Sequence, residues 1–353
     1  MNFALIGCGR ISQKHADAIT GISDGKLVAC ADPVIEKAEE LGESYQCSAY
    51  ADYHQMLEEH ADIDVVSILT PSGLHAEHGI EVARRYRKHI VVEKPMALRL
   101  ADADEMIRAC DEEGVRLFVV KQNRFNLPVV RLRAALEAGR FGRWTLGTVR
   151  VRWRRDQAYY DQAAWRGTWA LDGGVFANQA SHHVDLLEWM MGDPISVMAK
   201  TATFFANIEV EDTGIAVIRF ASGALGVVEA TTATRPKDIE GSLSILGERG
   251  TVEIAGFAVN RMKTWEFEDA DEEETREVFE SSAENPPDVY GFGHRRYLEH
   301  VIEAVRTGRR ALVDGLEGRK SLELINAIYE SAETGREVPL RYEPRWSRLG
   351  RAT

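Results

Sequence analysis

The fold is decided by the opening stretch of the chain, Met1 to Ser12, which reads MNFALIGCGRIS. Met1–Ile6 is apolar enough for a strand that is buried on both faces, and Gly7 and Gly9 permit a tight turn into a helix. Backbone N–H groups of such a turn can approach a pyrophosphate closely, and the N-terminus of the helix favours its charge. Because glycine turns after strands are common, the pattern needs support from the rest of the chain.

That support comes from short apolar runs at 27–31, 65–69, 90–92 and 117–120, which alternate with segments of helical periodicity. Strands that alternate with helices form a parallel sheet with right-handed crossovers. We therefore predict a Rossmann-type, doubly wound parallel sheet over residues 1–123.

After residue 123 the pattern changes. A helix at 127–138 precedes strand-like stretches at 144–154, 195–205, 213–220, 224–233, 242–246 and 251–254. Successive strands without helices between them indicate antiparallel pairing. We predict an α+β domain with a large, mainly antiparallel open-faced sheet over 124–340, interrupted by a helix at 174–191. Closing helices at 290–306 and 316–333 are expected to pack back near the first domain.

Composition excludes several classes of protein. The net charge of −13 argues against a nucleic-acid partner. No apolar run approaches the roughly 18 residues that cross a bilayer, and a strand starting at Met1 leaves no room for a signal peptide. The four cysteines (Cys8, Cys30, Cys47 and Cys110) have no zinc-site spacing. We expect a cytoplasmic protein without a metal, and a solvated face or loop for the acidic run at 266–280.

An acidic residue at the end of the second apolar run indicates the cofactor. A carboxylate at Asp32 accepts hydrogen bonds from an adenosine ribose and repels a 2′-phosphate, which favours NAD over NADP. Capping the helix after Pro33 is its alternative role. Ligands bind at the carboxyl ends of parallel strands, although Thr70 and Ser72 could equally be helix caps. The expected cofactor-binding residues are Gly7, Gly9, Arg10, Ile11, Asp32, Thr70, Ser72, His75, Glu93, Lys94 and Gln122.

Two further motifs carry residues for acid–base chemistry. Lys94, in Glu93-Lys94-Pro95, lies at a strand's carboxyl end, where an ammonium beside an oxidised nicotinamide can polarise a hydroxyl. In the expected helix at 174–191, Asn178 and His182 share one face, and a histidine can accept a hydroxyl proton as hydride leaves. The alternatives are a solvated lysine and a packing histidine. His183 is expected to be structural, and Asp185 to orient His182 or bind backbone.

The motifs at 7–11, 93–95 and 173–185, with Val313-Asp314-Gly315 and the segment 318–321, resemble those of the Gfo/Idh/MocA oxidoreductases. The resemblance covers nearly the whole chain. It implies a Rossmann domain, a sheet domain used for oligomerisation as a homodimer or homotetramer, and a lysine–histidine pair at the nicotinamide. Trp165 and Arg166 resemble a pair that lies near the nicotinamide in this family.

The chain departs from the common family pattern at Asn178, where an aspartate is usual. An amide can position a hydroxyl but cannot take its proton, so Lys94 and His182 must divide the acid–base work. The stretch 152–169 resembles a narrower branch that acts at C3 of UDP-N-acetylglucosaminuronate. There Arg155, Tyr159 and Tyr160 are expected to bind substrate with Lys94, Asn178 and His182, although the arginines could instead only solvate an exposed strand.

The sequence therefore predicts an NAD-dependent dehydrogenase that oxidises a secondary hydroxyl of a nucleotide-linked sugar. Two alternatives remain open. One is a dehydrogenase of inositol or a free hexose, and the other is a non-catalytic NAD-binding regulator, which the presence of both Lys94 and His182 disfavours.

Overall fold

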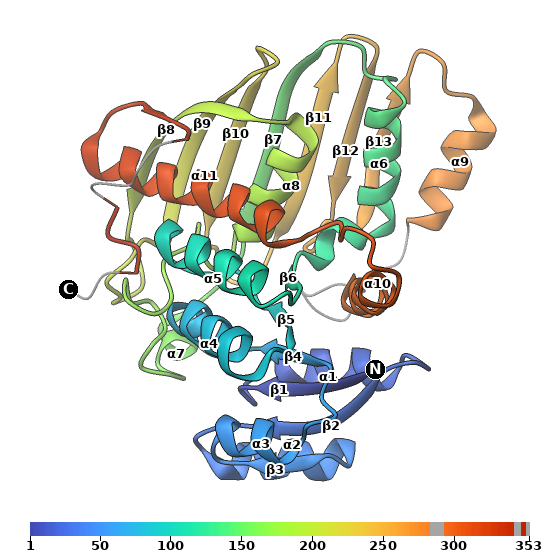
Figure 1. The fold of residues 1–353 in the computed structure, drawn as a ribbon. Helices are drawn as coiled ribbons and strands as arrows, with labels where there is room; N and C mark the ends of the chain where they lie inside the picture. The colour runs from blue at the N-terminus through green and yellow to red at the C-terminus, as the bar shows by residue number, and fades with distance from the viewer. Residues whose placement is uncertain (283–292, 342–346, 351–353) are drawn as a thin grey trace. The chain divides into compact units, whose positions relative to one another are not determined.

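A computed structural model of the chain describes residues 1–282, 293–341 and 347–350. The chain divides into two compact units (Figure 1). The first comprises residues 1–121 with 294–319, and the second comprises 122–293 with 320–353. The helix α11 (Gly315–Thr334) therefore begins in the first unit and continues in the second.

The first unit is built on a six-stranded sheet in the order β3-β2-β1-β4-β5-β6, with every neighbouring pair parallel. This is the strand order of a dinucleotide-binding fold, and it confirms the predicted Rossmann sheet. Its strands are β1 (Asn2–Ile6), β2 (Lys26–Ala31), β3 (Ser48–Tyr50), β4 (Val65–Ile68), β5 (His89–Val92) and β6 (Leu117–Val119). Its helices are α1 (Ser12–Thr20), α2 (Ile35–Tyr45), α3 (Tyr53–Glu59), α4 (His75–Glu81) and α5 (Leu100–Glu112), with nearly all of α10 (Gly293–Thr307).

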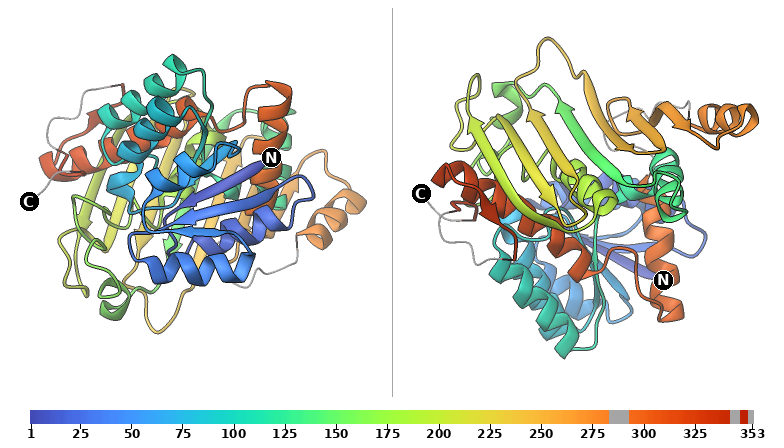
Figure 2. Two further views of the ribbon diagram at one scale, coloured as in Figure 1. Left: turned by 60° about the horizontal axis from the view of Figure 1, so that its bottom comes forward. Right: turned by 90° about the horizontal axis from the view of Figure 1, so that it is seen from above.

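The second unit contains an eight-stranded sheet in the order β13-β12-β11-β7-β10-β9-β8-β14. Strands of this sheet lie side by side in the green to orange part of the chain (Figure 2). Only β7 and β10 pair in parallel among the neighbouring strands of this sheet, so the predicted, mainly antiparallel sheet is confirmed. Its strands are β7 (Trp144–Arg152), β8 (Pro194–Ala202), β9 (Thr213–Phe220), β10 (Leu225–Thr231), β11 (Glu240–Gly247), β12 (Gly250–Ala255), β13 (Arg261–Phe267) and β14 (Val338–Pro339).

Within residues 1–282, 293–341 and 347–350, one face of this second sheet is covered and the other has exposed side chains. The helix α8 (Ser181–Met191) packs on β7, β10 and β11. Along β9 every second side chain is buried, and those between are exposed. Strict alternation of this kind is typical of a sheet with one face toward the core. The remaining helices of this unit are α6 (Leu127–Glu137), α7 (Gln157–Tyr160) and α9 (Glu272–Ser281).

The acidic run at 266–280 is not a loop throughout. Its first residues end β13, and most of the rest form α9, which Asp271 caps by accepting the N–H of Glu274 at 2.7 Å. Only Val278 of α9 is buried, as expected for a solvated helical face. Of the helix expected at 290–306, residues 290–292 lie outside the described residues. None of the helices in the described part of the chain combines the length and the apolar character needed to cross a membrane.

Candidate functional site

The glycine turn after β1 is shaped by two different requirements. Gly7 has φ +99°, and a Cβ there would lie 2.9 Å from the carbonyl carbon of Leu69, so only glycine fits. A Cβ at Gly9 would meet no heavy atom of the described residues within 4 Å. The fold therefore requires the first glycine, whereas the second keeps space open above the turn, next to exposed Arg10 and half-buried Ile11. Such a cradle suits a pyrophosphate at the start of α1.

Asp32 joins the end of β2 to this turn. One carboxylate oxygen (Oδ2) accepts the backbone N–H of Cys8 and the other (Oδ1) accepts that of Val34, each at 2.9 Å. The second bond holds Val34, the N-cap residue of α2, but the helix itself has no side-chain cap, so the bond only fixes its entry. The side chain remains half-buried, and its position beside the turn is the one that a ribose-binding carboxylate takes in this fold.

The loops after β4 and β5 are linked by His75. Its two ring nitrogens each lie 2.8 Å from a backbone carbonyl oxygen, that of Thr70 and that of Pro95. Burial lowers the pKa of His75, and a neutral imidazole donates only one of these bonds. The ring is 1% exposed. Its contacts therefore hold the two loops in place without requiring a direct polar contact with the cofactor. Thr70 Oγ1 meets His78 Nδ1 at 3.0 Å, and Ser72 is buried in a single 3-10 turn.

Lys94 follows a buried cluster of titratable groups. Glu93 Oε1 lies 3.0 Å from His15 Nε2, and Glu93 Oε2 accepts the N–H of Lys94 at 3.1 Å. Burial would raise the pKa of Glu93, but the hydrogen bond and charge of His15, with the charges of His294 and Lys94, lower it to about 2. His15, Glu93 and His294 each bring a ligand atom within 4.8 Å of the others. The direct hydrogen bond between His15 and Glu93 explains that approach without an ion. The half-buried Lys94 precedes a cis peptide bond to Pro95.

In the second unit, His182 lies at the start of α8 with 8% exposure. Its Nε2 is 3.1 Å from Nε2 of Gln122, which belongs to the buried 3-10 helix Gln122–Phe125. Gln122, expected at the cofactor, thus also contacts the candidate base. The neighbouring His183 is fully buried and packs edge-on against Trp153, with the two ring centroids 5.6 Å apart, in agreement with a structural role.

Asp185 has a partner that the sequence did not reveal. Arg124 donates to both of its carboxylate oxygens, from Nε and Nη2, at 2.9 Å each. Both side chains are almost fully buried, and the guanidinium also lies 4.7 Å above the ring of Trp189. This bidentate pair fixes α8, and with it His182, against the 3-10 helix that carries Gln122.

The expected helix at 174–191 is wrong in its first third, because α8 begins only at Ser181. Residues 174–180 form turns instead. Two side chains from distant segments bind their backbone: Glu211 accepts the N–H of Phe176 at 3.1 Å, and the Tyr329 hydroxyl accepts that of Gly174 at 3.0 Å. A Cβ at Gly174 would overlap the Glu211 carboxylate, so glycine is required there. Asn178 thus lies before the helix that carries His182, and not one turn away on the same helix.

Glu211 is a buried acid, and within the described part of the chain its side chain is hydrogen-bonded to no cationic group. It is 4% exposed and receives the Tyr329 O–H at 2.9 Å on Oε1. Burial raises the pKa of Glu211 to about 7, although its hydrogen bonds act in the opposite direction. The negative field of Asp172 raises it further.

Two of the expected substrate-binding residues, Arg155 and Tyr159, lie together with Arg166, which was expected near the nicotinamide. The guanidiniums of Arg155 and Arg166 lie 5.3 and 4.4 Å from the ring centre of Tyr159, and Arg166 donates to its hydroxyl at 2.5 Å. The guanidinium of Arg166 also lies 4.9 Å from the ring of the half-buried Trp165. Tyr160 is different: it is buried, and its hydroxyl meets Thr232 at 3.2 Å. Tyr160 is therefore a buried packing residue beside Tyr159 and offers no exposed ring to a substrate.

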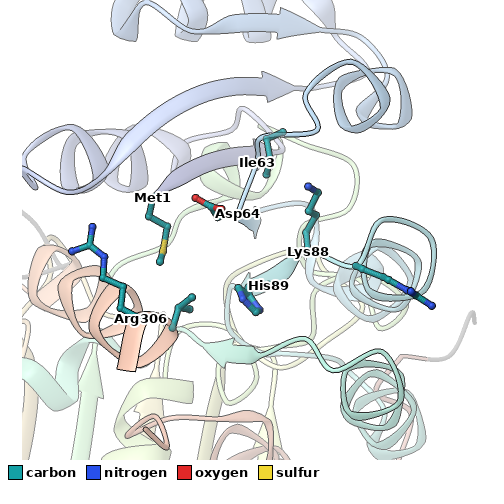
Figure 3. Close-up of a pocket in the computed structure, with 8 residues that line it drawn as sticks. Met1, Ile63, Asp64, Lys88, His89 and Arg306 are labelled. Carbon is teal, nitrogen blue, oxygen red and sulfur yellow. The ribbon is translucent and has the colours of Figure 1, made fainter. Parts of the chain in front are cut away.

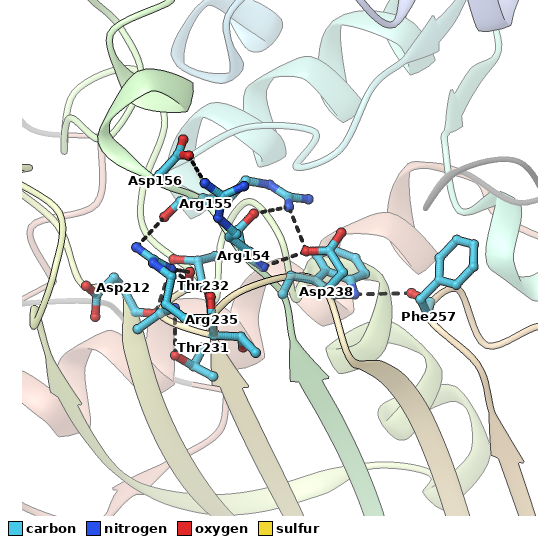
Figure 4. A network of polar contacts seen from close by, with 12 residues as sticks. Arg154, Arg155, Asp156, Asp212, Thr231, Thr232, Arg235, Asp238 and Phe257 are labelled. Carbon is cyan, nitrogen blue, oxygen red and sulfur yellow. Dashed lines mark hydrogen bonds and ion pairs between the residues drawn. The ribbon is translucent and has the colours of Figure 1, made fainter.

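The arginine-rich stretch separates into two sets. On β7, Arg150 and Arg152 form ion pairs with glutamates of the neighbouring strands. That half of the stretch is a solvated strand face. Beyond β7, Arg155 donates to the carbonyl oxygen of Arg154 and to Asp238, and Arg235 donates to the carbonyl oxygens of Thr234 and of Arg155 itself (Figure 4). The second set is the better candidate for binding an anionic substrate.

A cavity of about 370 Å³ lies elsewhere on the first unit (Figure 3). Its lining includes Met1, Asp64 and His89, which are at or next to the amino ends of β1, β4 and β5. Dinucleotides bind at the opposite, carboxyl ends of such strands. The cavity is therefore separate from the cofactor site.

Comparisons with known proteins agree with this arrangement. A family model described as oxidoreductase family, NAD-binding Rossmann fold, matches residues 1–121, and one described as the C-terminal alpha/beta domain of the oxidoreductase family matches 133–340. The WlbA dehydrogenase from Bordetella pertussis, solved with NADH and UDP-GlcNAcA, is 45% identical with a TM-score of 0.91, over 97% of this chain and 98% of that chain. The corresponding complex from Chromobacterium violaceum is 44% identical with a TM-score of 0.90, over 96% of both chains. The myo-inositol 2-dehydrogenase of Thermotoga maritima is 28% identical, over 96% of this chain and 98% of that protein.

Proposed function

The chain belongs to the Gfo/Idh/MocA oxidoreductase family, and from that premise we propose that it oxidises the C3 hydroxyl of UDP-N-acetylglucosaminuronate with NAD. The observation that carries the proposal is the 45% identity, over nearly the full length of both chains, to a dehydrogenase solved with NADH and UDP-GlcNAcA. The chain also keeps the lysine and histidine that the chemistry requires, Lys94 and His182.

The first unit supplies the cofactor-binding residues of the proposal. The open cradle at Gly9 receives the pyrophosphate, and Asp32 accepts hydrogen bonds from the adenosine ribose. A carboxylate there repels a 2′-phosphate, which selects NAD. When bound, NAD supplies the hydride acceptor.

The proposed base is Nε2 of His182. An amide nitrogen only donates, so the Gln122 amide nitrogen makes this ring nitrogen an acceptor. The ring proton then resides on Nδ1; Nε2 has a single lone pair, so the substrate hydroxyl displaces the Gln122 N–H before Nε2 takes its proton. The Lys94 ammonium holds the same sugar oxygen and stabilises its developing negative charge. Asn178 orients the sugar, Arg155 and Tyr159 bind the anionic part of the substrate with Tyr160 packed beside them, and Arg166 lies with Trp165 near the nicotinamide.

The experiment is a substrate panel with the purified protein. We expect NADH formation with UDP-N-acetylglucosaminuronate, at a kcat/KM at least about tenfold above that for UDP-N-acetylglucosamine, because the latter lacks a carboxylate for arginine. Activity confined to myo-inositol or free hexoses would favour the polyol-dehydrogenase alternative. NAD binding without turnover of any sugar would favour the non-catalytic regulator.

Two variants test the assigned chemistry. Lys94→Ala and His182→Asn should each lower kcat by at least about a hundredfold, the usual contribution of a positioned acid or base. Lys263→Ala is the matched control, because this exposed lysine on β13 pairs with Glu253 and has no role in the proposed mechanism. Near wild-type kcat in both test variants would contradict the mechanism.

We also propose that the protein is a cytoplasmic homodimer or homotetramer. The uncovered face of the second sheet exposes apolar side chains that lie side by side, including Met198, Ile215, Val217 and Leu225. Apolar surface concentrated on one face is typical of a subunit interface. Light scattering coupled to gel filtration tests the assembly: a monomer at micromolar concentration would contradict it.

A further inference from the structure

Asn178 has a buried partner for its side-chain amide. The Asn178 Nδ2 group donates to Oδ1 of Asp172, which is 1% exposed and directly precedes the glycine pair. The other oxygen of Asp172 accepts the N–H of Gly167 at 2.7 Å. The backbone on both sides of the amide is fixed as well, because Asn178 N donates to Gly174 O and Ser181 Oγ donates to Asn178 O, each at 3.0 Å.

This contact decides which way the amide faces. A carboxylate only accepts hydrogen bonds, so it must meet the N–H side of the amide, and the carbonyl oxygen then points the other way. Without such a partner the two orientations of an asparagine amide differ little in energy. A substrate hydroxyl would then face the amide NH2 group in one orientation and the carbonyl oxygen in the other.

The same contact explains why an amide suits this position. An aspartate at 178 would place a second carboxylate against that of Asp172, and Glu211 lies against the neighbouring Gly174 as well. Like charges at such short range in a buried site are unfavourable, and one of them would have to take a proton.

We propose that Asp172 is the positioning residue of the substrate site: it holds the Asn178 amide so that its carbonyl oxygen accepts a hydrogen bond from a sugar hydroxyl. The inference rests on the proposed function, in which Asn178 orients the sugar. It assigns a role in substrate orientation to Asp172, which the sequence motifs did not indicate. Asp172 touches no reacting atom and acts only through Asn178.

The test is an exchange of the two side chains. Asp172→Asn removes the fixed acceptor, and Asn178→Asp creates the carboxylate pair; each should lower kcat/KM for the UDP-sugar at least about tenfold, the range for a hydrogen bond to a charged group. The double variant Asp172→Asn/Asn178→Asp restores one amide and one carboxylate in contact. It should recover most of that loss, while the KM for NAD stays unchanged in all three. Asp269→Asn, an exposed aspartate paired with Arg140, is the control for the chemical change.

The unfolding temperature of each variant separates positioning from folding. If Asp172 and Asn178 act as described, both single variants are destabilised and the exchange restores the unfolding temperature together with kcat/KM. The proposal would be overturned if the losses of the two single variants, in kcat/KM or in unfolding temperature, simply added in the double variant. A wild-type kcat/KM in Asp172→Asn would overturn it as well. If the unmodified protein does not oxidise the UDP-sugar, the proposed function fails; the unfolding temperatures of the same four proteins then still decide whether Asp172 and Asn178 are coupled.

Discussion

Replacing Glu211 with glutamine should remove much of the protein's loss of stability between about pH 5 and pH 8. Burial raises the pKa of Glu211 to about 7 in the folded chain, against an ordinary value of 4.5. Since the folded pKa is the higher one, the folded state binds more protons than the unfolded state between these values. The resulting stabilisation is fully present below pH 4.5 and is lost as the pH rises through 7.

The size of the effect follows from the difference between the two values, 7 − 4.5 = 2.5 pKa units. Each unit corresponds to about 1.4 kcal/mol, so the complete loss of stabilisation is about 3.5 kcal/mol, most of it between about pH 5 and pH 8. The glutamine is isosteric and neutral at every pH, and its oxygen can still accept the N–H of Phe176, to which Glu211 is bonded. The folded loop at 174–180 should therefore survive the substitution.

The assay is the free energy of unfolding in urea for the wild type and Glu211→Gln at about pH 5 and about pH 8. Glu266→Gln, at an exposed position on β13, controls for the loss of one carboxyl group. The reasoning would be refuted by a fall in stability between the two pH values that is equally large in Glu211→Gln and the wild type.

Four further substitutions test the two units. Gly7→Ala should lower the unfolding temperature because of its positive φ and the backbone it would strike, whereas Gly9→Ala should fold normally and lose at least about tenfold in NAD affinity by fluorescence titration. Asp32→Ser should reduce the preference for NAD over NADP, measured as the ratio of the two kcat/KM values; an unchanged ratio would argue against the ribose contact. Asp185→Asn removes the carboxylate charge that pairs with the buried Arg124 and should cost about 3–5 kcal/mol in urea unfolding; a loss below about 1 kcal/mol would mean that the pair is not needed to hold α8.

The sheet of the first unit was predictable because buried parallel strands are apolar on both faces and need no tertiary context to be recognised. The short edge strand β3 and the helix α3 after it were missed. The three residues of β3 are exposed or half-buried, so the sequence there carries no apolar run. In the second unit, β13 was missed because it runs into the acidic segment that was expected to be a solvated face or loop.

The candidate site was less predictable where its geometry depends on residues distant in sequence. The spacing of Asn178 and His182 suggested one continuous helix, but Glu211 and Tyr329 bind the backbone before Ser181 and end that regularity. No residue near the motif at 173–185 indicates that Glu211 and Tyr329 bind this backbone. The roles of Lys94, Asn178 and His182 in chemistry remain predictions, since they depend on a substrate rather than on the fold.

The central claim is that hydride passes from C3 of the sugar to NAD, and a single turnover with UDP-N-acetylglucosaminuronate deuterated at C3 tests it most directly. Enzyme in excess over substrate makes the result independent of whether the reduced cofactor is released. The account predicts that deuterium appears at C4 of the nicotinamide and that the reaction is slower than with the unlabelled sugar. Unlabelled NADH, with deuterium retained on the sugar, would contradict it.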